Sequence, residues 1–382
     1  MPKTYRTYIP EFKGSIEDEW KQCLDKILVA FSDGLIPVKL NIFADNQELK
    51  SFLGTRELFI KSVNDAFRSE SPAVNLTAQP PEKPFKVAVE ATYISSGSIN
   101  VTRKEFGSIP YTVLETNIAK EVWAAGISSY SFVDDTRLAA EKAFELVEGI
   151  LGNEGMTPDN LVRQWNYIAN ILEVKNGIRN YQVFNDVRYD FYRRSRRVPG
   201  FPAATGVGTK HGGVILDFCA ISSGSVKITA VENPDQVNAY DYSQQILNGF
   251  AGQGMHQKHP PQFERALLID HGSEKILHIS GTASIIGQET AGIKDIRRQT
   301  LVTIGNIRKV SDRERLSGLT SKPLSGYPVF SLFRVYIKNQ EDFPVVRRIL
   351  NENFQGVPVL FVEADICRDN LLMEIEAEAV LS

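Results

Sequence analysis

Three glutamates alternate along one stretch of the sequence and form its most suggestive group of acids. Glu374, Glu376 and Glu378 stand in the run Leu-Met-Glu-Ile-Glu-Ala-Glu-Ala-Val that begins at residue 372. Successive side chains of a strand point to opposite faces, so the three carboxyl groups would share one face. A glutamate buried beside other carboxylates keeps its proton near neutral pH and can act as a general acid. Alternating glutamates are more often the solvated face of a strand, so the pattern alone leaves both interpretations open.

Arg265 and Arg334 are our candidates for holding an acidic ligand, because arginine offers a forked pair of donors that fits a carboxylate. Arg265 follows Phe263 just before an expected strand. Arg334 begins another strand, on which Tyr336 would share its face and offer a phenolic hydrogen bond. Surface solvation or salt bridging is the commoner fate of an arginine.

Small residues and one cysteine complete the candidate site. Gly281 and Thr282 lie in the run 280–284, Ser-Gly-Thr-Ala-Ser, where small side chains let backbone N–H groups approach an anion. The same run is equally consistent with a tightly packed strand end. Cys367 lies seven residues before Glu374. Taken alone, such a cysteine is more often a small buried hydrophobe than a reactive group.

The elements that must position these residues recur in one order along the chain. Near the C-terminal end, residues 334–354 predict a strand, a turn and an amphipathic helix, and two strands follow at 359–364 and 372–380. The same order is expected over 37–43, 46–67, 73–78 and 85–91, and again over 165–172, 183–194, 204–207 and 214–221. Further helices are expected at 138–151 and 294–310, each after a strand.

This repetition predicts an α+β fold, in which helices cover one face of each sheet. We expect three modules, at residues 1–95, 96–224 and 225–382, with the alternating glutamates in the last. Three independent domains with accidentally similar elements are the alternative interpretation.

Composition narrows the classes of function. The chain has 382 residues, 42% of them hydrophobic, and a formal net charge of -3, so no large basic field would attract nucleic acid or an anionic membrane. Arginines and aromatics cluster over 188–197, but a helix ending in cations explains them. The five histidines lack ligand spacing. The glycines of the loop 248–261 do not form a dinucleotide fingerprint, and we expect them to mark a mobile loop near the candidate site. We expect no metal, no cofactor, no signal peptide and no membrane span, and hence a cytoplasmic protein.

Two segments resemble the Rid (YjgF-like) superfamily: the strand and helix start at 335–343, and the ending Glu374-Ile375-Glu376-Ala377. Rid proteins are trimers with clefts between subunits. The resemblance implies three tandem Rid/YjgF-like (chorismate-mutase-like) modules that form a pseudo-trimer within one chain. Rid imine deaminases carry a carboxylate-binding arginine fifteen residues before the position of Glu374. Val359 stands there, and the other copies offer Ala203-Ala204 and Ala73-Val74, which argues against imine deamination.

Most of the chain also resembles a narrower family, the chorismatases. This resemblance is carried by the runs 163–167, 201–209, 232–240, 263–266, 280–287 and 364–376. The resemblance implies that chorismate is the substrate, that its enolpyruvyl group leaves as pyruvate, and that Glu374 is the general acid. Arg265 and Arg334 would then hold the two carboxylates of the substrate.

Cys367 resembles the residue that marks the chorismatase branch forming hydroxybenzoate, which favours 3-hydroxybenzoate as the product. The alternatives are hydrolysis to a dihydroxycyclohexadiene carboxylate, or a non-catalytic Rid-like protein that binds a small carboxylate or RNA. We expect a monomer or a weak homo-oligomer.

Overall fold

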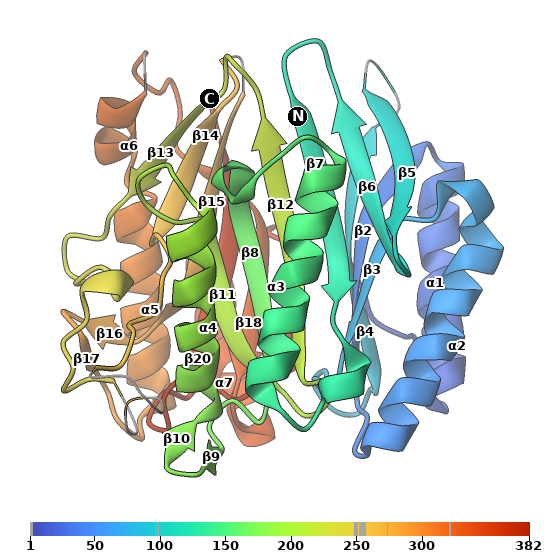
Figure 1. Cartoon of the computed structure of the whole chain (residues 1–382), viewed down its shortest axis with the longest axis horizontal. Coiled ribbons are helices and arrows are strands. Elements are labelled where there is room, and N and C mark those ends of the chain that lie inside the picture. The colour runs from blue at the N-terminus through green and yellow to red at the C-terminus, as the bar shows by residue number, and fades with distance from the viewer. Residues whose placement is uncertain are drawn as a thin grey trace.

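The computed structural model contains three large β-sheets with helices on their outer faces (Figure 1). It describes residues 3–95, 97, 99–247, 251, 257–272, 274–320 and 322–382. We call the sheets N-terminal, middle and C-terminal, with strand orders β1-β4-β2-β3, β11-β8-β12-β7-β6-β5 and β13-β14-β15-β20-β18-β19. The α+β fold class predicted from the sequence is confirmed.

The N-terminal sheet consists of β1 (Thr4–Tyr8), β2 (Leu35–Ala44), β3 (Ala73–Thr77) and β4 (Val87–Ser95). The middle sheet consists of β5 (Asn100–Phe106), β6 (Ile109–Glu115), β7 (Lys120–Ile127), β8 (Leu161–Ala169), β11 (Ala203–Thr209) and β12 (Val214–Ser222). The C-terminal sheet consists of β13 (Lys227–Val231), β14 (Ala266–Asp270), β15 (Lys275–Ala283), β18 (Val329–Ile337), β19 (Val359–Glu363) and β20 (Met373–Leu381). Two short hairpins are β9 (Val174–Lys175) with β10 (Ile178–Arg179), and β16 (Ile285–Ile286) with β17 (Glu289–Thr290).

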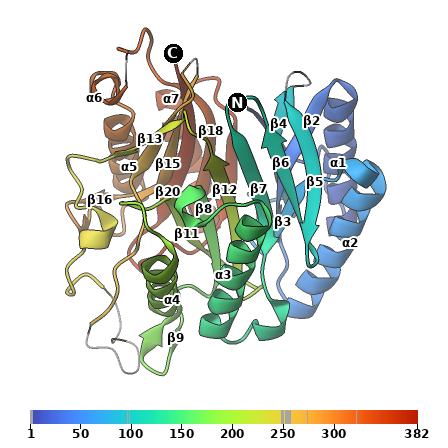
Figure 2. The same cartoon turned by 45° about the horizontal axis from the view of Figure 1, so that its top comes forward.

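The helices are α1 (Ile16–Ser32), α2 (Leu49–Phe67), α3 (Thr136–Asn153), α4 (Asn180–Ser195), α5 (Ile296–Val310), α6 (Arg313–Leu319) and α7 (Phe343–Asn353). The first two pack on the N-terminal sheet, α3 and α4 on the middle sheet, and α5 and α7 on the C-terminal sheet (Figures 1 and 2). The long helices expected at 138–151 and 294–310 correspond to α3 and α5.

One pairing pattern recurs in all three sheets. The first strand of each unit runs parallel to the second and antiparallel to the third, as β2 does with β3 and β4, β8 with β11 and β12, and β18 with β19 and β20. A helix joins the first strand to the second in each case, because a parallel pair requires a crossover connection. The strand, helix, strand, strand order read from the sequence is therefore the order in the structure.

The alternation along β20 separates an apolar face from an acidic one. Met373, Ile375 and Ala377 pack into the core beneath the helices of the C-terminal sheet. The glutamates at 374, 376 and 378 lie on the other face and are only 4%, 3% and 6% exposed. The interpretation of these glutamates as a solvated face is wrong, because the middle and N-terminal sheets cover them.

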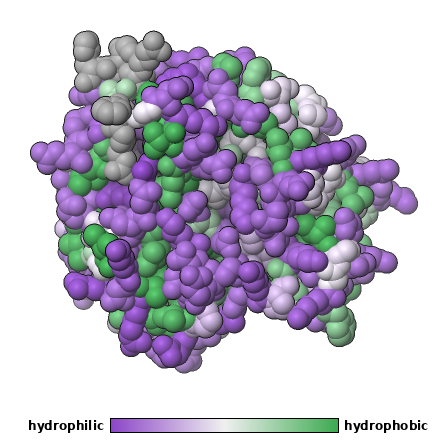
Figure 3. Space-filling view, turned by 90° about the horizontal axis from the view of Figure 1, so that it is seen from below, coloured by the Kyte–Doolittle hydropathy of each residue, from purple (hydrophilic) through white to green (hydrophobic). Residues whose placement is uncertain are grey.

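The inner faces of the sheets meet around buried charged and aromatic residues. Lys39 pairs with Asp217 at 2.7 Å between the N-terminal and middle sheets, and further ion pairs join the C-terminal sheet to both. Seen from below, hydrophilic side chains cover most of the surface, with hydrophobic ones scattered among them (Figure 3). Among the described residues, no helix is both long and apolar enough to cross a membrane.

Candidate active site

A cleft that is partly open to solvent lies between the middle and C-terminal sheets. Its walls come from α4 and the residue before it, from the two segments 242–247 and 261–265 before β14, from β11 and from β15 with the residues just after it. The segment that leads into β20, and the start of β20, complete them. Neighbouring strands β11 and β15 bring the two sheets together here. Aromatic and aliphatic residues line much of the cleft, and its charged lining consists of Glu374 and of arginines 179, 188, 265 and 368. The arrangement suits a small anionic ligand with an apolar body.

Glu374 is the acid of this cleft and is held in its protonated form. Burial, followed by the negative charge of Glu376, raises its pKa from 4.5 to about 8, against the opposing effects of Arg163 and Arg265. Among the described residues, no side chain donates a hydrogen bond to this carboxyl group. Glu374 therefore carries a proton at neutral pH that it can donate to a ligand.

Gly281 makes room for that carboxyl group. A Cβ atom at this position would collide with a carboxylate oxygen of Glu374. The backbone N–H of Gly281 donates to the Thr205 hydroxyl at 3.1 Å, which fixes β15 against β11. Thr282 does not line the cleft, and its hydroxyl donates to the Ser280 carbonyl at 2.8 Å. The small-residue run thus serves close packing at Gly281 and a local backbone contact at Thr282.

Arg265 lies in the cleft with unused hydrogen-bonding capacity. It is 6% exposed, and its Nη2 donates to the Tyr242 hydroxyl at 2.8 Å and to the Val237 carbonyl. Its Nε has no partner among the described residues although it is buried. An unpaired buried donor is costly, and a bound carboxylate would satisfy it.

Two further arginines in the cleft have the same property. Arg188 donates through Nη2 to Asn185 at 2.8 Å, and Arg179 donates to Asp369 at 2.7 Å. Within the described part of the chain, the Nε of Arg188 and both Nε and Nη1 of Arg179 lack partners. The cleft therefore presents several guanidinium N–H groups to which no described residue is hydrogen-bonded.

Cys367 borders the same cleft as a thiol. Burial, followed by the negative charge of Glu374, raises its pKa to about 12. The neutral thiol packs against the apolar cores of the N-terminal and middle sheets. It can shape the cleft and donate a weak hydrogen bond, but it is not an ionised nucleophile near neutral pH.

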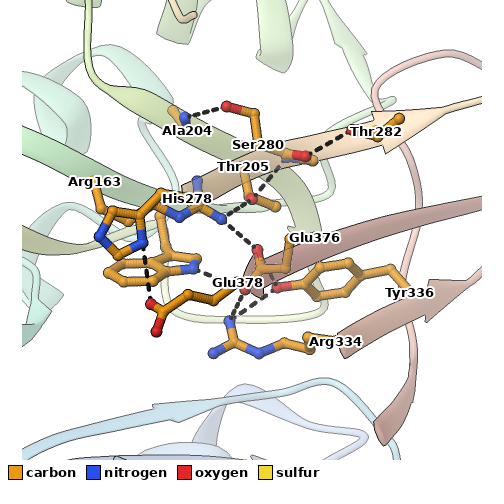
Figure 4. Close-up of polar contacts among 12 residues, drawn as sticks. Arg163, Ala204, Thr205, His278, Ser280, Thr282, Arg334, Tyr336, Glu376 and Glu378 are labelled. Atoms are coloured by element: carbon orange, nitrogen blue, oxygen red, sulfur yellow. Dashed lines mark hydrogen bonds and ion pairs between the residues drawn. The ribbon is translucent and has the colours of Figure 1, made fainter. Parts of the chain in front are cut away.

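Arg334 and Tyr336 lie behind the cleft, not in its wall. Arg334 is fully buried, with Nε 2.8 Å from Glu90 and Nη1 2.9 Å from Glu376. The same Nη1 donates to the hydroxyl of Tyr336 at 3.1 Å (Figure 4). The bidentate geometry expected of Arg334 is present, but its partners are carboxylates of the protein.

Glu376 is the centre of this buried network (Figure 4). Arg163 donates to it at 3.0 Å, and the Trp165 indole donates at 2.8 Å. Burial alone would raise the pKa of Glu376, but the guanidinium groups of Arg334 and Arg163 hold it below its ordinary value. Glu374 and Glu376 therefore share one face of β20 in opposite protonation states.

The arginines at 179, 188 and 368 were not among the candidates from the sequence. Arg188 had a detectable signal, because it follows Phe184 by four residues on the buried face of α4, where an arginine needs a partner. The loop 248–261 was expected near the site. Residues 248–250 and 252–256 lie outside the described residues, and Pro261 does line the cleft. In the part that is described, no group of three or more His, Cys, Asp or Glu is placed to hold a metal.

Comparisons with known proteins agree on one family. The family model described as "Chorismatase FkbO/Hyg5-like, N-terminal" matches residues 100–220. A protein of Streptomyces hygroscopicus named 3-hydroxybenzoate synthase is 31% identical over 252 residues, which cover 64% of this chain and 69% of the relative. A protein of Streptomyces rapamycinicus named chorismatase is 31% identical over 226 residues, covering 57% of this chain and 63% of the relative. The crystal structure of a chorismatase superimposes with a TM-score of 0.68 at 20% identity, over 99% of this chain and 98% of that one, which shows the shared fold.

Proposed function

Because the chain belongs to the chorismatase family, we propose that it is an enzyme that releases pyruvate from chorismate, with 3-hydroxybenzoate as the favoured second product. One observation carries the proposal: a protonated glutamate in a cleft faces buried arginine donors that lack partners among the described residues. The relatives named 3-hydroxybenzoate synthase and chorismatase support this choice of substrate and product.

The cleft matches the chemistry of such a substrate. Chorismate carries two carboxylates and an enol ether on a six-membered ring, so it requires separate cationic contacts and an apolar wall. Arg265 and Arg188 supply guanidinium groups with N–H donors that no described residue accepts, and Arg179 adds a third. We propose Arg265 as a substrate-binding residue, together with these two arginines. Arg334 and Tyr336 are left out of the substrate contacts because Glu90 and Glu376 already occupy them.

Glu374 is the proposed catalytic acid. Its proton adds to the methylene carbon of the enol ether, and positive charge develops at the ether carbon. The bond between the ring carbon and the ether oxygen then breaks, and the group leaves as pyruvate with that oxygen. For 3-hydroxybenzoate, the neighbouring ring hydroxyl takes the vacated position, and the ring returns one proton to Glu374 as it becomes aromatic. Donation from a buried acid with a pKa of about 8 is favourable near neutral pH, because acid strength and proton occupancy are then balanced.

The two product pairs differ in their demand for water. A hydroxybenzoate and pyruvate together contain all the atoms of chorismate, whereas the dihydroxycyclohexadiene carboxylate requires one added water. Cys367 borders the cleft as a neutral thiol and packs against apolar residues. We propose that it favours hydroxybenzoate by shaping the part of the cleft where the ring lies.

We further propose that residues 1–95, 96–224 and 225–382 are three Rid/YjgF-like modules in a pseudo-trimer. The recurring strand pairing supports this, as do three carboxylates that face the first strand of each unit. Glu90 faces Asn41, Asp217 faces Trp165 and Glu376 faces Arg334. A pseudo-trimer places its clefts within one chain, so sedimentation should report a monomer or a weak homo-oligomer.

The decisive experiment incubates the purified protein with chorismate and follows pyruvate and ring products by chromatography. Glu374→Gln is the test variant. Glu378→Gln is the matched control, because it removes a carboxyl from the same face of β20 but does not line the cleft. Pyruvate with 3-hydroxybenzoate, lost only in Glu374→Gln, supports the proposal. Pyruvate with a non-aromatic diol would refute the product assignment, and no pyruvate would refute the function.

A further inference from the structure

The N-terminal sheet is linked to the active site by a buried contact, although none of its described residues lines the cleft. Among the described residues that line the cleft, the first in the chain is Arg179. The contact is made by Glu90 on β4, which is 2% exposed and accepts hydrogen bonds from Arg334 through both carboxylate oxygens. Asn41 on β2 holds Glu90 in place with an amide donor at 3.1 Å. The first 95 residues thus deliver one oriented carboxylate to the centre of the molecule.

Arg334 joins that carboxylate to the strand of the catalytic acid. Its guanidinium lies between Glu90 and Glu376, with its Nη1 2.9 Å from Glu376 and its Nε and Nη2 directed to Glu90. Arg163 and Trp165 approach Glu376 from the middle sheet. Glu376 is therefore fixed by donors from two sheets, and it remains ionised although it is buried.

A fixed negative charge two residues from Glu374 on the same face has a direct electrostatic effect. Removing the proton from Glu374 would place two buried carboxylates side by side, which is unfavourable. Arg163 opposes this effect, but Arg334 is shared with Glu90 and does not neutralise Glu376 alone. Like-charge repulsion therefore adds to burial in holding the proton on Glu374.

Other charged and titratable groups also face Glu374. They come from the elements packed against it and are Tyr336 on β18, which lies directly opposite Glu374, Arg163 on β8, Arg265 before β14, Tyr181 and Arg188 on α4, and Cys367 with Arg368 before β20. The thiol and the two phenols stay neutral near pH 7, since burial raises the pKa of Cys367, Tyr181 and Tyr336. Among the described residues, Glu376 is thus the nearest anion along this face of β20 and raises the pKa of Glu374, whereas Arg163 and Arg265 lower it.

We propose that Glu376 is a positioning residue that keeps the catalytic proton on Glu374, and that Glu90 tunes it by sharing Arg334. The proposal rests on the proposed role of Glu374. It gives the N-terminal sheet an indirect role in the reaction, although this sheet does not line the cleft.

The test compares the pH dependence of single-turnover pyruvate release in the wild type, Glu376→Gln and the control Glu378→Gln. Glu374 must be protonated to react, so activity is lost as pH rises through its pKa. Removing the charge of Glu376 lowers that pKa, and the alkaline limb should move to lower pH by about one unit or more. The Glu378 variant should keep the limb of the wild type, since Glu378 pairs instead with Tyr5 and His278. A uniform loss at every pH, without a shifted limb, would overturn the proposal.

Glu90→Gln provides a second variant that alters no residue of β20. Arg334 would then belong to Glu376 alone, and the limb should shift in the same direction by a smaller amount. If Glu376→Gln does not fold, Glu90→Gln serves as the test. An alkaline limb of pyruvate release that stays at the wild-type pH in Glu90→Gln would overturn the proposal.

A direct titration separates this proposal from the proposed function. Protein labelled with ¹³C at glutamate carboxyls can be titrated by NMR, with Glu374→Gln used to assign the resonance. A Glu374 resonance that titrates at lower pH in Glu376→Gln supports the inference even if chorismate is not the substrate. An unchanged midpoint overturns it even if pyruvate is released.

Discussion

Replacing Glu374 with glutamine is expected to abolish turnover and at the same time to stabilise the fold above neutral pH. Glutamine has nearly the same shape but cannot ionise or donate an acidic proton. In the folded protein the pKa of Glu374 is raised from 4.5 to about 8, chiefly by burial. The unfolded chain loses this proton near the ordinary value, so it binds fewer protons than the folded protein between the two values.

The size and sign of the effect follow from linkage. When folding raises the pKa of a carboxyl group, the free energy of unfolding is unaffected at pH values below the pKa of the unfolded state. It then decreases as pH rises toward the pKa of the folded state. From about pH 5 to about pH 8, the wild type should lose about 3 to 4 kcal/mol of unfolding free energy through this one group, at 1.36 kcal/mol per pKa unit. Glu374→Gln should not show that loss.

The assay is urea unfolding of both proteins at these two pH values, with tryptophan fluorescence as the signal. The difference between variant and wild type should be small at the acidic pH and should favour the variant by about 3 to 4 kcal/mol at the alkaline one. Parallel pH curves for the two proteins would refute the reasoning, because they would show that Glu374 titrates equally in the folded and unfolded states.

Three further substitutions test the cleft itself. Arg265→Lys keeps the charge but loses the fork, so kcat/KM for chorismate, measured as pyruvate release, should fall by about ten-fold to one hundred-fold, and an unchanged value would exclude Arg265 from substrate binding. Gly281→Ala should remove most activity, measured as pyruvate release, since the added methyl group would displace the Glu374 carboxyl; an active variant would contradict the packing described. Cys367→Ala should still release pyruvate but alter the ratio of hydroxybenzoate to diol on chromatography, and an unchanged ratio would remove the thiol from product selection.

The sequence was sufficient for the strand carrying the acid, because a period of two is a local property. The alternation along β20 placed Glu374, Glu376 and Glu378 on one face correctly. Whether that face meets water or protein depends on Arg163 and Glu90, which are 213 and 244 residues from their partners Glu376 and Arg334. No local pattern encodes such contacts, and burial of the face was therefore beyond prediction without the resemblance.

The partner of Arg334 likewise could not be predicted from a local pattern. Its forked geometry was expected, but its partner was assigned to the substrate when it is Glu90 of the N-terminal sheet. The sequence around Arg188 predicts no ligand contact, because its neighbours Arg193 and Arg194 end the helix and account for the whole cluster of cations. Charge type can be read from sequence, whereas the identity of a counter-ion requires the fold.

The position of β20 in its sheet has a consequence for biosynthesis. This strand follows all other strands of the C-terminal sheet in the sequence, yet it lies between β15 and β18 in space. During translation the sheet therefore stays divided into two halves until β20 has left the ribosome. The network that links Glu90, Arg334 and Glu376 cannot form before that point. The strand that completes the sheet is also the one that bears Glu374, so a nascent chain acquires its acid only in the step that joins the halves.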